Sequence, residues 1–397
     1  MAARPESHSS RLSAARREGE RVTPLELFFD LVFVLAITQC TALMADRPTW
    51  SGLLQGLLVL GVLWWAWVGY SWLTSVIDPE EGATRLVMFV AMAALLVAAL
   101  CVPEAFDNLG LTFALAIGVF RVAHIALFML AGADDEELRR SVIGLAVSTA
   151  VAVTLLAVAS LFDGLAQGAL WALAIFLDMA GPYFFGSEGW KLVPGHFAER
   201  HGLIVIIALG ESIVAIGIGA AGAFDFGIGV VAVLGMALAA ALWWIYFDVV
   251  ALISARRLAE APPGRVQNEL ARDSYSYVHL ALVAGIVLVA FGLKTTIGHA
   301  DEHLHDVPAF ALLGGVAVYL LGLVAFRYRQ ARTVNRRRLG LAIVLLILVP
   351  VASSIPAWTS LLVVDLLIWA MIAYEHRGYG ESREQLRHEN TVAHEGA

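Results

Sequence analysis

Long apolar runs separated by short polar segments fill most of this chain. Most of the runs are roughly 18–25 residues long, enough for an α-helix to cross a hydrocarbon core of about 30 Å, and the run at 226–254 is long enough to tilt. We therefore predict an all-α, polytopic membrane bundle of about twelve transmembrane helices. The runs fall at about 25–45, 52–76, 84–102, 109–132, 139–162, 164–185, 197–220, 226–254, 274–297, 307–328, 337–353 and 356–375.

The first predicted helix has a definite start and follows a basic segment. Thr23-Pro24-Leu25-Glu26 fits a capping box with proline at the first helical position, so the helix should begin there. Residues 1–22 are polar and Arg-rich, and no short apolar region with a small-residue cleavage site follows them. We interpret them as a basic cytoplasmic tail and not as a signal peptide. Residues 376–397 are also polar, and we expect a second, flexible cytoplasmic tail there.

The distribution of Lys and Arg between the loops predicts the orientation. When the N-terminus is placed in the cytoplasm, the outer loops contain Arg47 and little else that is basic. The positive-inside rule then places both termini in the cytoplasm. The inner loops contain Arg139, Arg140, Lys191, Arg256, Arg257, Arg265, Arg272, Arg327, Arg329, Arg332 and Arg336–Arg338.

The two halves of the chain share weak similarities in the same order. The second run contains Trp64-Trp65 before a tyrosine, and the eighth contains Trp243-Trp244 before another. The fifth run begins RRSVIGLAV and the eleventh RRRLGLAIV. We predict two six-helix repeats, at 23–186 and 187–375, and because six is an even number they should have the same orientation in the membrane.

Composition supports the membrane assignment and narrows the function. Of the 397 residues, 59% are hydrophobic and only 15% are charged, whereas soluble domains contain about a quarter charged residues. The net charge is −8, and the sequence has neither a basic face nor an RNA-binding or zinc-binding signature. We therefore expect no nucleic-acid partner. Cys40 and Cys101 lie in apolar runs without a CxxC spacing, and we interpret both as small buried residues.

One predicted span contains an unusual number of ionisable residues. An ionisable side chain within a transmembrane helix costs at least a few kcal/mol and by default suggests a functional site. Arg200 and Glu211 are about three helical turns apart and should share a face. This span, at 197–220, has His196, Glu199, Arg200 and His201 at its start and Glu211 near its middle.

Other predicted spans also contain charged or titratable residues at a similar depth. The predicted topology places most of them in a layer between the membrane midplane and the cytoplasm, where they should pair with each other or line water. Simpler interpretations remain open: Glu26 completes the capping box, Arg200 can form a structural ion pair with Glu199 or Glu211, and the single histidines can be hydrogen-bonded core residues. The residues are Glu26, Asp30, Arg121, His124, Asp178, Asp248 and His279, with Asp365 near the midplane.

Several motifs resemble those of a known family. The segments ELFFDLVFVLAI (26–37) and HFAERHGLIVIIALGESIVAI (196–216) resemble the bacterial low temperature requirement protein A family, as do FRVAHIALF (120–128) and SYVHLALVAGIVLVAFG (276–292). The resemblance covers most of residues 20–375 and implies a multi-pass bacterial inner-membrane protein, with a family name derived from a cold-growth phenotype. It does not imply a known biochemical activity.

A shorter segment is similar to a second family. Phe29-Asp30-Leu31-Val32-Phe33 is similar to the Phe-Ser-Asp signature of the endolysosomal transmembrane potassium channel family, whose members pair six-helix repeats. Here Phe29 replaces the serine, and the second half of the chain has no such motif.

We interpret the chain as a transporter or channel-like permease for a small ion or solute. Glu211 would titrate or coordinate a cation, Glu26, Asp30 and His201 would line the cytoplasmic entrance, and His124 and His279 would carry protons. One alternative is an intramembrane metal protein or enzyme using His196, Glu199, His201 and His279, although no HExxH, GxSxG or Walker motif is present.

A further alternative is a membrane scaffold without transport, in which the polar residues fasten helices together. An activity as an enzyme is the less favoured interpretation, and the sequence specifies neither a cofactor nor a metal. Besides the lipid bilayer and the small ion or solute, the sequence leaves a homo-oligomer open.

Overall fold

The computed structural model describes residues 21–80, 82–184, 189–220 and 225–395, with side chains up to residue 377. Over these residues the chain is helical apart from turns and one isolated bridge between His303 and Pro356. Eleven described helices are long and apolar enough to cross a membrane, which confirms the predicted helical membrane bundle. The predicted run at 337–353 forms α13 (Arg336–Ala352), whose 17 residues lie at the short limit for a span.

The described chain packs into two compact units that we describe separately. The first contains the chain up to Ile207 together with Leu258–Leu280, and the second contains Ala208–Arg257 and the chain from Ala281 onward. Helix α7 therefore begins in the first unit and ends in the second. The predicted boundary between repeats, at residues 186 and 187, lies outside the described residues, and the two-repeat arrangement stays a prediction.

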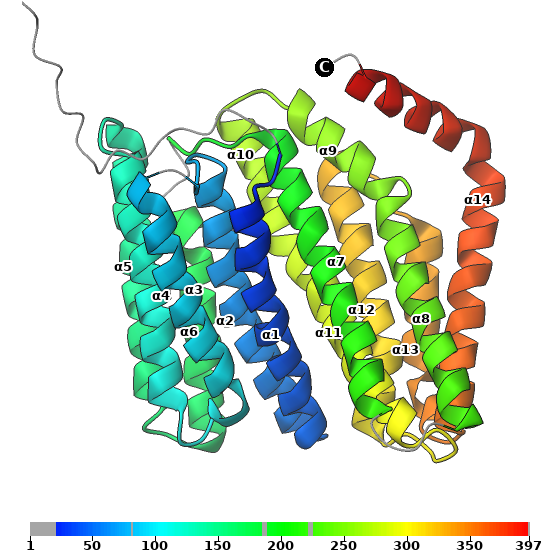
Figure 1. Cartoon of the computed structure of the whole chain (residues 1–397). Coiled ribbons are helices and arrows are strands. Elements are labelled where there is room, and N and C mark those ends of the chain that lie inside the picture. The colour runs from blue at the N-terminus through cyan, green and yellow to red at the C-terminus, as the bar shows by residue number, and fades with distance from the viewer. Residues whose placement is uncertain (1–20, 81, 185–188, 221–224, 396–397) are drawn as a thin grey trace, which may run out of the picture. The chain divides into compact units, whose positions relative to one another are not determined.

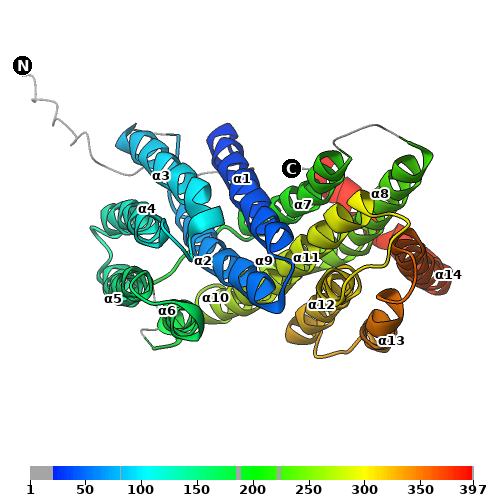
Figure 2. The same ribbon diagram turned by 90° about the horizontal axis from the view of Figure 1, so that it is seen from below.

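The first unit is built around α2. This helix lies beside α1, α4 and α6, and Figure 2 shows it between α1 and α6 when the unit is viewed end-on. The sequence of α2 has no polar face, as is typical of a helix that is covered on all sides. Most of α2 is indeed buried, because neighbouring helices cover it on several sides. The helices of this unit are α1 (Pro24–Asp46), α2 (Trp50–Thr74), α3 (Gly82–Cys101), α4 (Gly110–Ala131), α5 (Glu136–Ala159), α6 (Gly164–Phe184), the first part of α7 (Pro194–Gly219), α10 (Arg265–Leu270) and a π-helix (Ala271–Val278).

The second unit contains one very close helix pair. A Cβ on Gly285 would lie 2.7 Å from the carbonyl oxygen of Gly315, so only glycine permits α11 and α12 to approach this closely. Elsewhere in the unit α12 packs on α13, and α14 packs on α8 and α13 (Figure 1). Its helices are α8 (Phe226–Phe247), most of α9 (Val250–Glu260), α11 (His279–Gly298) from Ala281, α12 (Asp306–Ala331), α13 and α14 (Ala357–Glu395).

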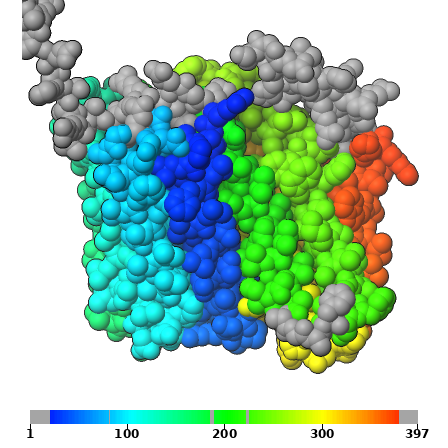
Figure 3. Space-filling view, in the orientation of Figure 1, coloured from blue at the N-terminus to red at the C-terminus, as the bar shows by residue number. Residues whose placement is uncertain are grey.

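The outward faces of the first unit are apolar. Large hydrophobic side chains on α3 and α4, such as Leu86, Leu100, Leu115 and Val122, are more than half exposed. Figure 3 shows α1 and α3 as neighbouring surfaces of this unit. A protein in water rarely exposes so much continuous apolar surface, whereas a lipid-facing surface requires it.

Several local predictions can be compared with the helices directly. The capping box at Thr23 is present, with both of its reciprocal hydrogen bonds. Pro182 lies inside α6, which continues to Phe184. The run predicted at 226–254 is divided at Asp248 and Val249 into α8 and α9. Helix α14 continues to Glu395 through the segment expected to be a flexible tail, and residues 1–20 of the basic tail lie outside the described residues.

Candidate functional site: a buried carboxylate–arginine cluster

A buried arginine joins two carboxylates of α1 in the first unit. Nη2 of Arg200 lies 2.9 Å from Oδ1 of Asp30, and its Nη1 lies 3.4 Å from Oε1 of Glu26. The side chains of Arg200 and Glu26 are completely buried, and that of Asp30 is 1% exposed. We refer to Glu26, Asp30, His196 and Arg200 as the Arg200 cluster.

The spacing of these residues on two helices produces the cluster. Glu26 and Asp30 are four residues apart in the first two turns of α1, and His196 and Arg200 are four residues apart in the first two turns of α7. Residues four apart lie above one another on the same helix face, so each helix presents a pair. Both helices also begin here, and their N-terminal dipole ends favour the carboxylates.

Glu26 serves the helix start and the cluster with different oxygens. Its Oε2 accepts hydrogen bonds from the backbone N–H and the hydroxyl of Thr23, at 2.9 and 3.1 Å. Its Oε1 faces Nε2 of His196 at 2.9 Å and the guanidinium of Arg200. The predicted capping role and the predicted site role of Glu26 are therefore compatible, because one carboxylate has enough lone pairs for both.

The proton on His196 decides the charge of the cluster. A carboxylate only accepts, so Nε2 of His196 donates to Glu26. Nδ1 lies 3.1 Å from Oγ of Ser75, which is also 3.1 Å from the carbonyl oxygen of Ser71. The one hydroxyl hydrogen of Ser75 can serve only one of these neighbours. When this hydrogen bonds to the carbonyl oxygen of Ser71, Nδ1 of His196 has to donate to Oγ of Ser75, so both ring nitrogens carry a proton. The positive imidazolium and Arg200 then balance the two ionised carboxylates. When it bonds to Nδ1, the imidazole is neutral and the cluster has one net negative charge.

Trp67 on α2 closes the cluster from the third side. Its indole N–H donates to Oδ1 of Asp30 at 2.9 Å, and the guanidinium carbon of Arg200 lies 5.5 Å from the centre of its ring. Oδ2 of Asp30 and Nε of Arg200 are buried and have no hydrogen-bond partner among the described residues. The cluster thus retains unused acceptor and donor capacity, which is costly in a dry interior.

His201, also expected at the entrance, lies in an aromatic enclosure beside the cluster. Its ring centre is 5.0 Å from that of Trp67, 5.2 Å from that of Tyr275 and 5.3 Å from that of His279. Nδ1 donates to the carbonyl oxygen of Phe197 at 2.8 Å, so Nε2 carries the lone pair. The ring is fully buried, and the structure therefore places it in the core of the first unit.

A second buried ion pair links α4 to α5 and α6. Nη2 of Arg121 lies 3.2 Å from both carboxylate oxygens of Asp178 and 2.6 Å from the hydroxyl of Thr149. The hydroxyls of Thr149 and Ser148 also lie 3.1 and 3.4 Å from Oδ1 of Asp178. Arg121 and Asp178 were both predicted site residues, and the structure brings them together, but in a group separate from the Arg200 cluster.

The remaining predicted residues lie in other places. Glu199 is exposed, and its Oε2 accepts a hydrogen bond from the backbone N–H of Val22 at 3.2 Å. His124 is buried, with its ring centre 5.1 Å from that of Tyr70. Glu211, Asp248 and Asp365 are buried in the second unit. Their role in a site stays a prediction.

Potential metal ligands do not converge. Within the described parts of the chain, no group of three or more His, Cys, Asp or Glu side chains has an arrangement that could hold a metal ion. His196 is engaged with Glu26 and Ser75, and His201 with aromatic rings and a carbonyl oxygen. Both histidines therefore already have neighbours in the first unit, and the alternative of an intramembrane metal protein stays a prediction.

Two residues that contact the Arg200 cluster, Trp67 and Ser75, were not predicted. Neither Trp67 nor Ser75 was among the residues that the sequence pattern singled out. A buried indole N–H normally finds an acceptor, so an apolar helix with three tryptophans within four positions was a usable signal. Ser75 had no such signal, because serine is frequent near helix ends.

Known proteins are similar to this chain over nearly the whole of its membrane domain. A protein of Rhizobium meliloti (strain 1021), described as uncharacterized, is 27% identical over 392 residues, which cover 94% of this chain and 94% of that protein. No solved structure matches this chain. The family model described as "Bacterial low temperature requirement A protein (LtrA)" matches residues 21–373. With this match and its eleven candidate spans, the chain is a multi-pass bacterial membrane protein that belongs to the low temperature requirement A family.

Proposed function

We propose that this protein is a transporter or channel-like permease for a small ion or solute, and that its polar centre is the Arg200 cluster. The observation that carries the proposal is a group of two carboxylates, one guanidinium and one imidazole that is buried inside a membrane-spanning unit. Such groups are expensive in a membrane, and they are typical of ion pathways and proton relays.

The unused hydrogen-bonding atoms of the cluster support a dynamic role more than a purely structural one. A structural ion pair is most stable when every hydrogen-bonding atom is used. Here Oδ2 of Asp30 and Nε of Arg200 have no hydrogen-bond partner among the described residues. A cation or a proton entering the cluster would bind to the unused carboxylate oxygen.

We further propose the proton as the ion that the cluster conducts. His196 bridges Glu26 and Ser75, and the cluster changes between neutral and singly negative when one proton is added to or removed from this ring. Histidine is the side chain whose ordinary range of titration suits this exchange near neutral pH. In the predicted orientation the cluster would face the cytoplasmic half of the membrane.

Proton flux into proteoliposomes tests this proposal. The purified full-length protein is reconstituted with a pH-sensitive dye inside, and a potassium diffusion potential drives protons inward. We expect flux well above that of protein-free liposomes, and a loss of at least tenfold in Asp30→Asn and in His196→Gln, since either change removes a proton-exchanging or charge-balancing group.

Glu375→Gln supplies the matched control, because Glu375 is a buried, arginine-paired carboxylate of the second unit. Its flux per folded protein should equal that of the wild type. Equal flux in all variants, or flux no higher than in protein-free liposomes, would contradict the proposal.

A further inference from the structure

A carboxyl group within α14 of the second unit is buried without a hydrogen-bond partner. Asp365 is 4% exposed, and neither of its side-chain oxygens has a hydrogen-bond partner among the described residues. The residue lies inside the candidate span Ala357–Arg377, and the predicted topology places it near the midplane of the membrane. A buried polar group that is left unsatisfied in a native structure requires an explanation.

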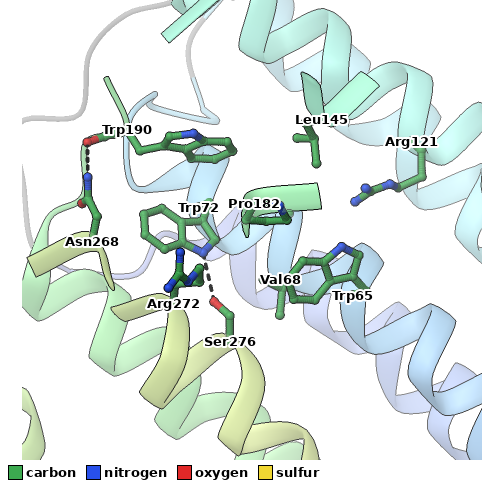
Figure 4. A pocket seen from close by; sticks show the side chains of 11 residues that line it. Trp65, Val68, Trp72, Arg121, Leu145, Pro182, Trp190, Asn268, Arg272 and Ser276 are labelled. Carbon is green, nitrogen blue, oxygen red and sulfur yellow. Dashed lines mark hydrogen bonds between the residues drawn. The ribbon is translucent and has the colours of Figure 1, made fainter. Parts of the chain in front are cut away.

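Polar groups in the first unit show the more usual arrangement. The indole N–H of Trp72 donates to the hydroxyl of Ser276 at 3.0 Å (Figure 4). In the same region the side chain of Asn268 donates to the carbonyl oxygen of Trp190 at 2.7 Å. Among the described residues, Asp365 is the one buried carboxyl group that lacks a hydrogen-bond partner at both oxygens. Its environment therefore has to be examined helix by helix.

Helix α13 presents only apolar residues at the depth of Asp365. The hydroxyl of Ser360 donates to the carbonyl oxygen of Ala352 at 3.1 Å, which places the end of α13 beside the start of α14. Nη2 of Arg338 lies 3.0 Å from Oε2 of Glu375, which places the start of α13 beside a later part of α14. Asp365 lies between these two contacts. The α13 residues between them have no polar or ionisable side chain.

Helix α8 offers no charged partner at this depth either. It packs beside α14 (Figure 1) and contains no ionisable side chain between Phe226 and Ile245. The titratable residues of α8 and its caps lie at its two ends: Asp225, Tyr246 and Asp248. On α14 itself, the residues one turn away on either side, Leu361 and Ile368, are apolar and fully buried. An ionised Asp365 would thus have no cation beside it on the helices that pack around it.

A proton is the ligand that fits this position. At pH 7 an ordinary carboxyl group in water keeps its proton in only about one molecule in a thousand. An isolated carboxylate in an apolar interior is disfavoured by many more factors of ten, so the group takes up a proton and becomes neutral. Both oxygens are enclosed by packed side chains, which leaves no room for a hydrated cation. Within the described parts of the chain, no group of three His, Cys, Asp or Glu side chains could hold a metal ion.

We propose that Asp365 is a proton-binding site of the second unit and that it is occupied at neutral pH. The proton binds to one carboxylate oxygen, and the resulting carboxylic acid is uncharged, so no counter-ion is needed. The site goes beyond the function proposed above, because it shares no residue with the Arg200 cluster and belongs to the other compact unit.

Infrared spectroscopy tests the bound proton directly. The full-length protein is measured at pH 7 in dodecyl maltoside, a detergent without a carbonyl group, so that the C=O stretch of a protonated carboxylic acid is visible. We expect this band in the wild type and its loss in Asp365→Asn, with the carboxylate bands unchanged. Glu375→Gln is the matched control, because Glu375 is a similarly buried carboxylate of α14 that accepts hydrogen bonds from Asn335 and Arg338. Its removal should reduce the carboxylate bands and leave the acid band in place.

The wild type is informative even where a variant does not fold. Aspartate labelled with ¹³C at its side-chain carboxyl carbon should shift the acid band, which assigns the band to an aspartate. Asp365→Leu, which replaces the acid with an apolar side chain, should lack the band as Asp365→Asn does. The proposal is overturned if the wild type has no band from a protonated aspartate, or if the band persists in a folded variant at position 365.

The pH dependence of stability supplies a second measurement. An aspartate in the unfolded chain loses its proton above about pH 4, whereas the folded protein would keep it, so the folded state binds one proton more and loses stability as the pH rises. Relative to Asp365→Asn, the unfolding equilibrium of the wild type should shift toward the unfolded state by up to about tenfold per pH unit. A wild type whose relative stability stays level or rises with pH would contradict the proposal. A negative result here would leave the proton-flux experiment unaffected.

Discussion

Arg200 in the first unit and Arg338 in the second are both buried arginines paired with carboxylates, but their surroundings differ. Arg338 forms a two-pronged pair with Glu375, with Nε and Nη2 at 3.3 and 3.0 Å from its two oxygens, and Asn335 donates to the same carboxylate at 2.9 Å. Both oxygens of Glu375 therefore have donors. Arg200 instead faces two carboxylates, and its Nε has no hydrogen-bond partner among the described residues.

In the proposal above, this difference separates a structural pair from the transport site. The Arg338–Glu375 pair, in which both carboxylate oxygens are matched with donors, fastens α13 to α14. The Arg200 cluster has a histidine and an unused carboxylate oxygen, Oδ2 of Asp30, as candidate positions for a proton. Burial of charge is common to both sites, so burial by itself does not identify a functional site, and the unused hydrogen-bonding atoms are the informative property.

The largest expected effect is the removal of Arg200. Arg200→Gln leaves two neighbouring buried carboxylates without their cation, and we expect a loss of about 3–5 kcal/mol in the free energy of unfolding. Arg338→Gln should cost less, about 1–3 kcal/mol, because Glu375 keeps Asn335 as a donor. Thermal unfolding midpoints of the two variants in the same detergent check this order, and a reversed order would contradict the comparison.

A smaller effect is expected for the indole that completes the cluster. Trp67→Phe keeps an aromatic ring beside Arg200 but removes the N–H that donates to Asp30, so about 1.5–3 kcal/mol should be lost. Trp171→Phe is the control, since this tryptophan is equally buried but stacks on Phe106 and Phe113. Equal shifts of the unfolding midpoint in both variants would mean that only ring packing matters.

Replacing the matched pair as a whole should have little effect. Arg338→Met combined with Glu375→Leu exchanges a buried ion pair for apolar side chains of similar volume, and such exchanges are often neutral or stabilising. We expect an unfolding free energy within about 1 kcal/mol of the wild type, and wild-type proton flux. The corresponding change Arg200→Met with Asp30→Leu should abolish flux, so preserved flux there would remove the distinction between the two sites.

The smallest effect is expected at an exposed, balanced pair. Asp135 accepts a hydrogen bond from Lys191 at 2.8 Å and caps α5, and these contacts, the lysine first, hold the pKa of Asp135 below its ordinary value. A carboxyl group whose pKa falls on folding adds stability above its unfolded pKa of about 4, and this stability is lost as the pH decreases through the folded pKa.

Asp135→Asn keeps a capping side chain and removes the charge. At pH 7 it should cost less than about 1 kcal/mol, and the difference from the wild type should become smaller when the pH is lowered to about 3. Unfolding midpoints measured at both pH values check this, and a difference that grows at low pH would show the opposite sign.

The boundaries of the helices could be predicted well, and the pairing of their polar residues could not. The run at 109–132 became α4 (Gly110–Ala131), and the capping box placed the start of α1 correctly. One interpretation that the sequence left open paired Arg200 with Glu199 or Glu211 on its own helix, yet its observed partners Asp30 and Glu26 are about 170 residues away in sequence. Periodicity identifies which residues share a face but contains no information about the facing helix.

The sequence by itself determined that this chain forms apolar membrane helices, where most of them begin and end, and which ionisable residues lie within them. These properties follow from local physics, namely the cost of exposing backbone groups and charges to hydrocarbon. Only the tertiary structure decided that Glu26 and Asp30 meet His196 and Arg200, that Trp67 joins them, and that Arg121 pairs with Asp178. Those contacts depend on how separate helices pack, and a similarly apolar helix of another sequence could satisfy the same local rules without making them.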